Sequence, residues 1–455
     1  MARNVIIPSD PALPQLEMIR ERPLFIARLQ KAIAASQGGG LTVNDIFITE
    51  CQHRKGVTCR LLMEVEFQTA EGYREWQTYI VRAGRPDDNN LDQQYQTTQQ
   101  NDLATPRFGP PVLFWREWNL LLWAYPNDPN LPGLRLLEDA EALSAYIKMH
   151  PERIGLESPS VLPLSLKRQK LKVVPGKRGG FLVQLHYRHP AGDEKSHTVY
   201  AKLFRKGYGR EAYELLQTIW QHPLRQSGDL QIPRPYAFDD ERSIMWQEAI
   251  QGVPLSKNIE YLQGAETLAA EIGGKLATLH AIRVWLPEQM TLDYQLNEIQ
   301  QAADRISRKF PDYADRARQL ATRLQKTAQR FSGRLRTLVH GSFKFSHILI
   351  TPTGIQLIDF DAANLGDPGY DVGRFMAHIL KMQASGKLPS ELAQAINQQF
   401  CQGYNERAQT PLPQDYINWF CASHLLASQA FKSVKKNKPA LLDALFDLAN
   451  AYCLD

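Results

Sequence analysis

The stretch that decides the fold is Val339-His340-Gly341-Ser342-Phe343-Lys344-Phe345-Ser346-His347-Ile348-Leu349-Ile350, followed by Leu357-Ile358-Asp359-Phe360-Asp361. Apolar residues with strand character lie on both sides of a polar loop. Ser342, Lys344 and His347 lie within this loop, and Asp359 and Asp361 end the apolar run that follows it. Hydroxyl, cationic, imidazole and carboxylate groups at these positions predict a reactive or ligand-binding centre.

The order of these residues resembles the catalytic loop of the aminoglycoside phosphotransferase and choline kinase family, where His-Gly-Asp-x-x-x-x-Asn is followed by Ile-Asp-Phe. In that family one Asp accepts the proton of the attacking hydroxyl, and an Asn and a second Asp hold metal. Ser342 stands here at the first Asp position and His347 at the Asn position, whereas Asp359 matches. The resemblance implies an α+β, bilobed protein-kinase-like fold with a degenerate catalytic loop.

Ser342 in place of the catalytic Asp and His347 in place of the Asn are expected to weaken phosphoryl transfer more than nucleotide binding. Ser342 is neutral at pH 7 and cannot replace a general base, which contributes roughly 10²–10⁴-fold to the rate. His347 is a poor ligand for the hard Mg²⁺ ion and suits softer metals. Asp359 can still hold one cation, and Asp361 points away from it unless the backbone turns. Lys344 lies where protein kinases place a phosphate-contacting lysine, although a solvent-facing loop lysine explains it equally well.

Composition places the chain among ordinary globular proteins, with 43% apolar and 22% charged residues. The net charge of +5 argues only weakly for an anionic ligand such as a nucleotide. Five scattered cysteines show no zinc spacing and indicate reduced, mostly buried thiols. We find no signal-peptide pattern and no run of transmembrane length. We therefore expect a cytoplasmic protein with no nucleic-acid or membrane partner.

Strand-like alternation occurs in two regions. The first, from about Ile46 to Val81, predicts a hairpin around the turn at 69–72. The Gln-rich and Asn-rich stretch at 87–102 predicts a surface loop. A short helix is expected near 138–149, and Pro and Ser at 151–163 favour a linker. The second β region has predicted strands at 171–174, 181–188, 198–204 and 243–246 with a helix at 209–220, and helical periodicity follows beyond Gly252.

This organisation predicts an N-terminal β-rich domain at 1–150, a linker at 151–165, a kinase-like N-lobe at 166–250 and a helical C-lobe at 251–455. The two β regions also look alike, because Arg54-Lys55-Gly56 and Lys177-Arg178-Gly179 precede similar hairpins. We interpret this as an internal repeat of one lobe, with chance similarity as the alternative. Val81 then aligns with Lys202, so no phosphate-binding lysine is expected in the first copy.

Lys202 is the candidate phosphate anchor. It lies among mostly apolar neighbours in a predicted strand, where an unpaired charge is expensive. The following helix offers Glu211 and Glu214, and the resemblance implies that one of them pairs with Lys202, with Glu214 preferred. An edge-strand lysine that reaches solvent is the alternative.

Further candidate residues surround this anchor in the sequence. Gly176 lies in a turn rich in glycine and cations, which suits phosphate binding or an ordinary hairpin equally well. Gln247, Glu248 and Ala249 resemble the hinge, where the family holds adenine through backbone groups. We expect His280 to be a hydrogen-bonded core histidine. The resemblance implies that Asp371, in Gly-Asp-Pro-x-x-Asp, braces the catalytic loop.

Three functions compete. The chain is an ATP-dependent small-molecule kinase, with Asp361 or the substrate replacing the base, or a nucleotide-binding pseudokinase that acts on a partner, or a scaffold without nucleotide. Lys202 and Asp359 argue against the scaffold. We expect binding of ATP with Mg²⁺ or Mn²⁺ and weak or absent classical kinase activity. The acceptor of an active enzyme would be an amino sugar, a sugar or an amino alcohol.

Overall fold

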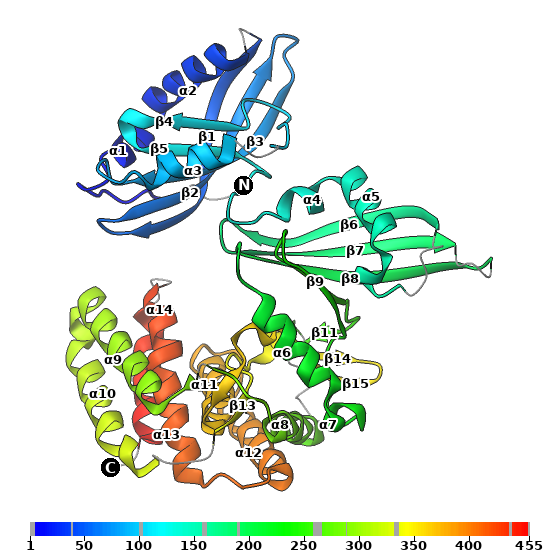
Figure 1. The fold of residues 1–455 in the computed structure, drawn as a ribbon. Helices are drawn as coiled ribbons and strands as arrows, with labels where there is room; N and C mark the ends of the chain where they lie inside the picture. Colours follow the sequence, from blue (N-terminus) through cyan, green and yellow to red (C-terminus); the bar gives the residue numbers. More distant parts are fainter. Residues whose placement is uncertain are drawn as a thin grey trace. The chain divides into compact units, whose positions relative to one another are not determined.

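A computed structural model describes residues 5–37, 40–99, 103–156, 162–188, 192–257, 266–287, 289–331, 336–435 and 439–453. The chain divides into two compact units: Met1–Arg210 with Tyr236–Ala249, and Glu211–Pro235 with Ile250–Asp455. The first unit is built on two β-sheets, and the second consists mainly of helices (Figure 1).

The first sheet is antiparallel, with strand order β1-β2-β3-β5-β4. Alternating apolar residues turn one face of each long strand toward the core, as in Leu61, Met63, Val65 and Phe67 of β2. Its elements are α1 (Gln15–Arg20), α2 (Arg22–Gln37), β1 (Leu41–Arg54), β2 (Thr58–Thr69), β3 (Arg74–Gly84), α3 (Asn90–Gln99), β4 (Val112–Trp115) and β5 (Leu120–Ala124).

The second sheet has the corresponding order, β6-β7-β8-β10-β9. Its elements are α4 (Leu134–Glu138), α5 (Ala140–Met149), β6 (Leu162–Val174), β7 (Arg178–Arg188), β8 (Glu194–Phe204), β9 (Pro235–Asp239) and β10 (Ile244–Glu248).

Strand register shows that the two sheets are counterparts. Thr58 pairs with Gly84 in the first sheet, and Arg178 pairs with Phe204 in the second, so corresponding residues are 120 positions apart. The last strands also correspond, with Ala83 opposite Leu120 and Leu203 opposite Ile244. Just before these strands, Asn119 and Ser243 both have positive φ, 42° and 50°. An uncommon left-handed conformation at the same position of both sheets supports the repeat.

The register corrects one detail of the sequence alignment. Lys202 pairs with Gly180 and Met245, and the residue with the matching partners in the first sheet is Arg82, not Val81. A shift of one residue moves a strand side chain to the opposite face. Val81 therefore belongs to the apolar core of the first sheet, whereas Arg82 is the counterpart of Lys202.

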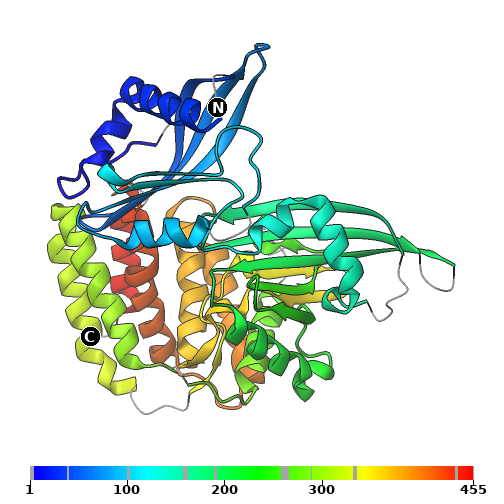
Figure 2. The same cartoon turned by 45° about the horizontal axis from the view of Figure 1, so that its top comes forward.

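Both sheets are covered on one face by the two helices that precede them (Figure 2). Leu16, Phe25 and Leu29 of α1 and α2 share a buried cluster with the first sheet. Leu134, Leu143 and Tyr146 of α4 and α5 share one with the second sheet. Burial of these large side chains, each contributing about 1.5–3 kcal/mol, holds each helix pair on its sheet.

The predicted surface loop at 87–102 is wrong for most of its length, because residues Asn90–Gln99 form helix α3. Leu91 and Tyr95 are four residues apart and lie on one face of this helix. They pack beside Ile80, Leu121 and Trp123 on the second face of the first sheet. Because most residues of this stretch are polar, the two apolar residues Leu91 and Tyr95 were not enough to predict a helix from the sequence. Residues 100–102 lie outside the described residues.

The predicted linker is only partly visible, because residues 157–161 lie outside the described residues. Pro151–Ile154 form a short 3₁₀ helix with Ile154 buried, and β6 starts at Leu162. The domain limits at 150, 165 and 250 remain predictions. The predicted hairpin, the helix near 138–149 and the strands at 181–188, 198–204 and 243–246 agree with the structure within a few residues. Strand β6 begins nine residues before the predicted start at 171, inside the predicted linker, and β9 was not predicted.

Most of the second unit is helical, with two small sheets of order β11-β14-β15 and β12-β16-β13. A π-helix at Leu425–Ala430 separates α13 from α14. The main elements are α6 (Arg210–Gln221), α7 (Pro223–Gln226), β11 (Val253–Pro254), α8 (Glu266–Ala281), β12 (Gln289–Met290), α9 (Leu292–Lys309), α10 (Ala314–Ala328), β13 (Thr337–Val339), β14 (Ile348–Thr351), β15 (Gly354–Leu357), β16 (Asn364–Gly366), α11 (Pro368–Ala384), α12 (Ser390–Arg407), α13 (Gln414–His424), α14 (Phe431–Lys435) and α15 (Leu442–Tyr452).

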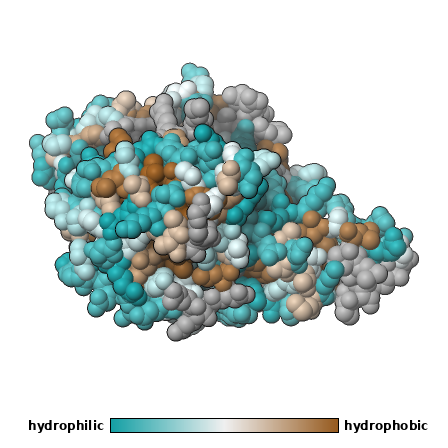
Figure 3. Space-filling view, turned by 90° about the horizontal axis from the view of Figure 1, so that it is seen from above, coloured by the Kyte–Doolittle hydropathy of each residue, from teal (hydrophilic) through white to brown (hydrophobic). Residues whose placement is uncertain are grey.

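The surface carries small hydrophobic areas among hydrophilic residues on the face drawn in Figure 3. Single exposed apolar side chains such as Ile6 and Trp285 contribute to the apolar surface. In the part of the chain that the structure describes, no helix is both long and apolar enough to cross a membrane. All five cysteines are free thiols, and four of them are buried, as expected.

Asp128 connects the two sheets within the first unit. Its carboxylate accepts hydrogen bonds from the backbone N–H groups of Gly176 and Asn130. We predict that Asp128→Ala lowers the free energy of unfolding by about 1–3 kcal/mol, because it leaves a buried N–H group without its acceptor. Urea unfolding will measure this change. The control is Asp240→Ala, which removes a surface ion pair with Arg210 and is expected to cost at most about 1 kcal/mol. Equal costs would contradict the structural role of Asp128.

Candidate functional site

The catalytic-loop residues are close together in the second unit. The loop leaves β13 at Val339, passes through a 3₁₀ turn at Phe345–His347 and enters β14. Gly341 has φ 69°, and a Cβ there would overlap the carbonyl oxygen of Ala362. The loop therefore needs glycine at this position for both conformation and space.

A buried carboxylate holds the loop in place. Asp371 Oδ2 accepts a hydrogen bond from the backbone N–H of His340 at 2.5 Å and lies 3.2 Å from His280 Nε2. The other nitrogen of His280 is 2.8 Å from the hydroxyl of Tyr404. These contacts confirm that His280 is a hydrogen-bonded core histidine and that Asp371 braces the loop.

Burial and hydrogen bonding act in opposite directions on Asp371. Burial raises the pKa of this carboxyl, but the bond with His280 and the nearby His340 hold the pKa below its usual value. Burial lowers the pKa of His340, whose side chain is completely buried. Its Nε2 is 3.0 Å from the carbonyl oxygen of Ile358, which ties the loop to the Asp359 segment.

Ser342, His347 and Asp359 form one hydrogen-bonded group. Ser342 Oγ lies 3.3 Å from His347 Nδ1 and 3.4 Å from His340 Nδ1. His347 Nε2 lies 3.1 Å from Asp359 Oδ2, and its ring stacks on that of His340 at 5.6 Å. His347, which stands at the Asn position of the family's loop, therefore contacts Asp359, which stands at the position of the family's metal-binding Asp.

The backbone turns sharply at Asp359, which has φ 70°. Phe360–Ala362 then form a short 3₁₀ turn, in which Asp361 is exposed. The extended geometry assumed for Asp361 from the sequence does not occur here. Lys344 is half-buried, and its backbone carbonyl accepts a hydrogen bond from the N–H of His347 at 2.8 Å.

The donor set fits a hard divalent cation poorly. Mg²⁺ prefers near-octahedral oxygen ligands, whereas one oxygen of Asp359 already contacts the imidazole of His347. Within the described ranges, no group of three or more His, Cys, Asp or Glu side chains could hold a metal ion. That Asp359 and His347 hold a metal ion stays a prediction.

The remaining candidates lie in the first unit, apart from Glu214. Lys202 is only 8% exposed on β8, and its ammonium lies 5.7 Å from the ring centre of Phe204. Gln247 and Glu248 end β10, and Ala249 follows. Glu214 lies on α6 in the second unit, so its pairing with Lys202 stays a prediction.

The turn at Gly176 has a structural contact that the sequence did not reveal. Gly176 has φ 65°, which suits glycine, and its N–H donates to Asp128. Arg60 donates from Nη1 to the carbonyl of Pro175 at 3.1 Å. This backbone N–H is therefore already used within the first unit, which favours the hairpin interpretation over phosphate binding.

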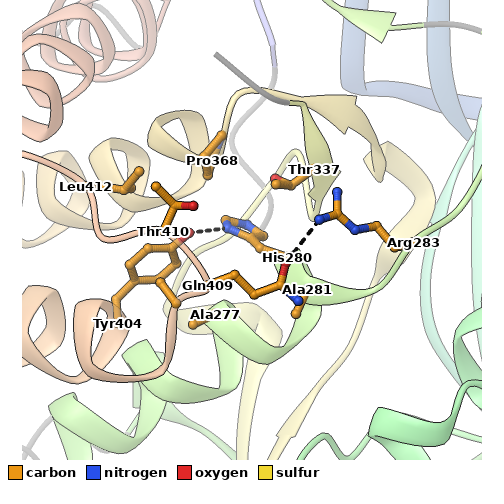
Figure 4. Close-up of a pocket in the computed structure, with 11 residues that line it drawn as sticks. Ala277, His280, Ala281, Arg283, Thr337, Pro368, Tyr404, Gln409, Thr410 and Leu412 are labelled. Atoms are coloured by element: carbon orange, nitrogen blue, oxygen red, sulfur yellow. Dashed lines mark hydrogen bonds between the residues drawn. The ribbon is translucent and has the colours of Figure 1, made fainter.

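Behind the loop, the second unit contains a pocket of ≈ 140 Å³ (Figure 4). His280 and Tyr404 point toward each other across it, and Arg283 donates to Gln409 at 3.0 Å. No predicted site residue other than the core histidine lines this pocket. Its walls include the side chains that position Asp371.

Residues 189–409 match the model described as the phosphotransferase enzyme family, APH. This region is similar to the phosphotransferase enzyme family. The phosphotransferase region includes β8, the Ser342 loop, Asp359 and α11, and it starts after the first sheet. No curated protein matches the chain.

Several solved structures are similar to the chain. A putative aminoglycoside phosphotransferase from Ralstonia eutropha JMP134 is 17% identical, with 69% of this chain and 98% of that chain covered and a TM-score of 0.45. An ethanolamine kinase of Plasmodium vivax is 15% identical (70% and 89% covered, TM-score 0.43). A choline kinase of Cryptosporidium parvum Iowa II is 12% identical (69% and 94% covered, TM-score 0.42). The structure has the expected α+β composition, with an additional β-rich region at the N-terminus.

We predict that Gly341→Ala destabilises the protein far more than Gly386→Ala. The two glycines share φ 69°, but a Cβ at Gly386 meets no atom within 4 Å. Left-handed backbone costs about 1–2 kcal/mol for alanine in both variants. The overlap with Ala362 adds at least about 2 kcal/mol at Gly341. Urea unfolding of both variants checks this difference, and equal costs would contradict the tight loop.

We predict that Asp371→Asn lowers the free energy of unfolding by about 1–3 kcal/mol at pH 7. Because the folded-state pKa of Asp371 lies below its unfolded value, the carboxylate stabilises the protein above about pH 4. This contribution is lost as pH falls through the folded pKa. The difference between wild type and variant should therefore shrink below about pH 4 in urea titrations. A constant difference would show that ionisation of Asp371 contributes nothing.

Proposed function

We propose that the chain is an ATP-binding protein of the phosphotransferase family with weak or absent classical kinase activity. The observation that carries this proposal is the contact of His347 Nε2 with Asp359 Oδ2 at 3.1 Å. This contact engages one oxygen of the carboxylate on which the metal would depend. Ser342 is hydrogen-bonded to two imidazoles. Its hydroxyl stands where the family has a carboxylate, and it cannot accept the proton of the attacking hydroxyl as that carboxylate would.

Nucleotide binding is supported by groups that do not depend on the replaced residues. Lys202 supplies a buried cation on β8, and Gln247, Glu248 and Ala249 end β10 where the family's hinge is expected. We propose Glu214 as the partner of Lys202 and Lys344 as a second phosphate contact. The ligand would be ATP, with Mg²⁺ or Mn²⁺ in a minor role.

An active small-molecule kinase is the second candidate function. The left-handed conformation of Asp359 and the turn after it leave Asp361 exposed beside the loop. Asp361 would then accept the proton of the attacking hydroxyl in place of Ser342. The substrate would be an amino sugar, a sugar or an amino alcohol.

Calorimetric titration of the full chain with ATP and ADP, with and without Mg²⁺ or Mn²⁺, tests nucleotide binding. We expect heat from a saturable site and a rise in melting temperature, since a ligand at a hundredfold its Kd stabilises by about 2.7 kcal/mol. Lys202→Met should remove one binding event, whereas Lys195→Met, an exposed lysine of the same strand, should remove none. No response to either nucleotide would sink the proposal.

Turnover separates the two candidate functions. We predict that wild type transfers the γ-phosphate of ATP to candidate acceptors no faster than background hydrolysis. A double variant, Ser342→Asp with His347→Asn, should raise turnover by roughly 10²-fold or more, because it restores a general base. Fast transfer by the wild type that falls in Asp361→Asn would establish the active kinase instead. A double variant without any gain would show that the acceptor site is also lost.

A further inference from the structure

The first unit contains a polar pocket of ≈ 360 Å³ that belongs to the N-terminal copy of the repeat. One wall is helix α3, which contributes Gln93 and Gln94. The opposite wall is the segment after β5, with Asn130 and Arg135, and Lys206 completes it. A pocket of this size can hold a small ligand that carries several hydrogen-bonding groups.

Both walls have counterparts in the second copy. Helix α3 starts at Asn90 and α6 at Arg210, so these helices follow the same 120-residue correspondence as the strands before them. The segment after β5 corresponds to the chain that follows the expected hinge at the end of β10. The pocket thus lies between the counterparts of the Glu214 helix and of the segment that follows the hinge.

Arg82 and Gln94 reproduce the expected pair of the second copy. Arg82 has the register of Lys202, and Gln94 is 120 positions before Glu214. In the structure, Arg82 Nη1 donates to Gln94 Oε1 at 2.9 Å. Gln94 has a neutral amide where Glu214 has a carboxylate. The hydrogen bond from Arg82 to Gln94 therefore fixes the position of the guanidinium without neutralising its charge.

Other cations surround Arg82. Arg60 is directly opposite it on β2, and like charges at opposed strand positions repel. Burial, opposed by Asp128 and reinforced by Arg205, lowers the pKa of Arg60. Burial and then Arg60 lower the pKa of Arg82. Within the described part of the chain, neither Arg60 nor Arg82 forms an ion pair with a carboxylate.

Two carboxylates act on this cluster, Asp128 on Arg60 and Asp88 on Arg82, and the oxygens of Asp128 are already in use. Asp128 lines the pocket, but its two oxygens accept the N–H groups of Gly176 and Asn130. An anion in the pocket would meet the cationic side chains of Arg135 and Lys206, and Arg82 is joined to the wall through its hydrogen bond with Gln94. Guanidinium groups bind phosphate oxygens in a bidentate manner, and amides add further hydrogen bonds.

We propose that this pocket is a second ligand site, which binds the di- or triphosphate group of a nucleotide or of inorganic polyphosphate. It is distinct from the site of the proposed function, because it uses the first copy of the repeat. Arg135 and Lys206 supply positive charge on the wall, and Arg82, held by Gln94 and paired with Arg60 across the strands, adds charge from behind the wall.

Titration calorimetry on the full-length Lys202→Met variant tests this site with ADP and with inorganic pyrophosphate. We expect one binding event to remain in this background. Binding of both ligands identifies the diphosphate group as the recognised element, and binding of ADP alone identifies a nucleotide site. If the Lys202→Met variant binds neither ADP nor pyrophosphate, the second site is ruled out. A single ATP site in the wild type would then still support the proposed function.

A second change in the same background locates the residual site. Arg82→Gln should weaken binding about tenfold to a hundredfold, as expected for loss of a charge-assisted bond. Arg74→Gln, an exposed arginine of the same strand, is the matched control and should leave affinity unchanged. Because Arg82 is partly buried, melting temperatures must be compared. If Arg82→Gln unfolds, the pocket-lining pair Arg135→Gln with Lys206→Gln replaces it. Unchanged affinity in a folded variant overturns the proposal.

Discussion

The carboxylate of Asp371 is the constraint on which the catalytic loop depends. It is completely buried, and a single oxygen serves both the His340 N–H and the imidazole of His280. A buried charge of this kind is tolerated only with such partners, and removal of one partner is strongly destabilising. The chemistry of the loop can therefore change at Ser342 and His347, whereas the brace behind it keeps the backbone in place.

The similarity of residues 189–409 to the phosphotransferase family could be predicted from the sequence because it depends on short, local signals. Gly341 and Asp371 meet steric and hydrogen-bonding needs that leave few alternatives, and their spacing is visible in a single sequence. The contact between His347 and Asp359 could not be predicted in this way. It depends on the left-handed conformation of Asp359 and on a turn that breaks the expected strand.

The N-terminal region shows where sequence reasoning fails. The repeat was visible in two basic turns, but turns do not define strand register, and one residue separates Val81 from Arg82. Helix α3 was missed because only Leu91 and Tyr95 signal its buried side, among glutamines and asparagines. Register and tertiary burial are long-range properties, and both had to be observed.

A chain that contains two sheets of the same strand order can form wrong strand pairs during folding. During folding, strands of one copy can pair with those of the other, and misassembly between neighbouring repeats is a characteristic failure of such proteins. Synthesis from the N-terminus reduces this risk, since β1 to β5 are complete at Ala124, before β6 begins at Leu162. The hydrogen bond between Asp128 and Gly176 needs the turn between β6 and β7, so it cannot form until the chain has passed Gly176.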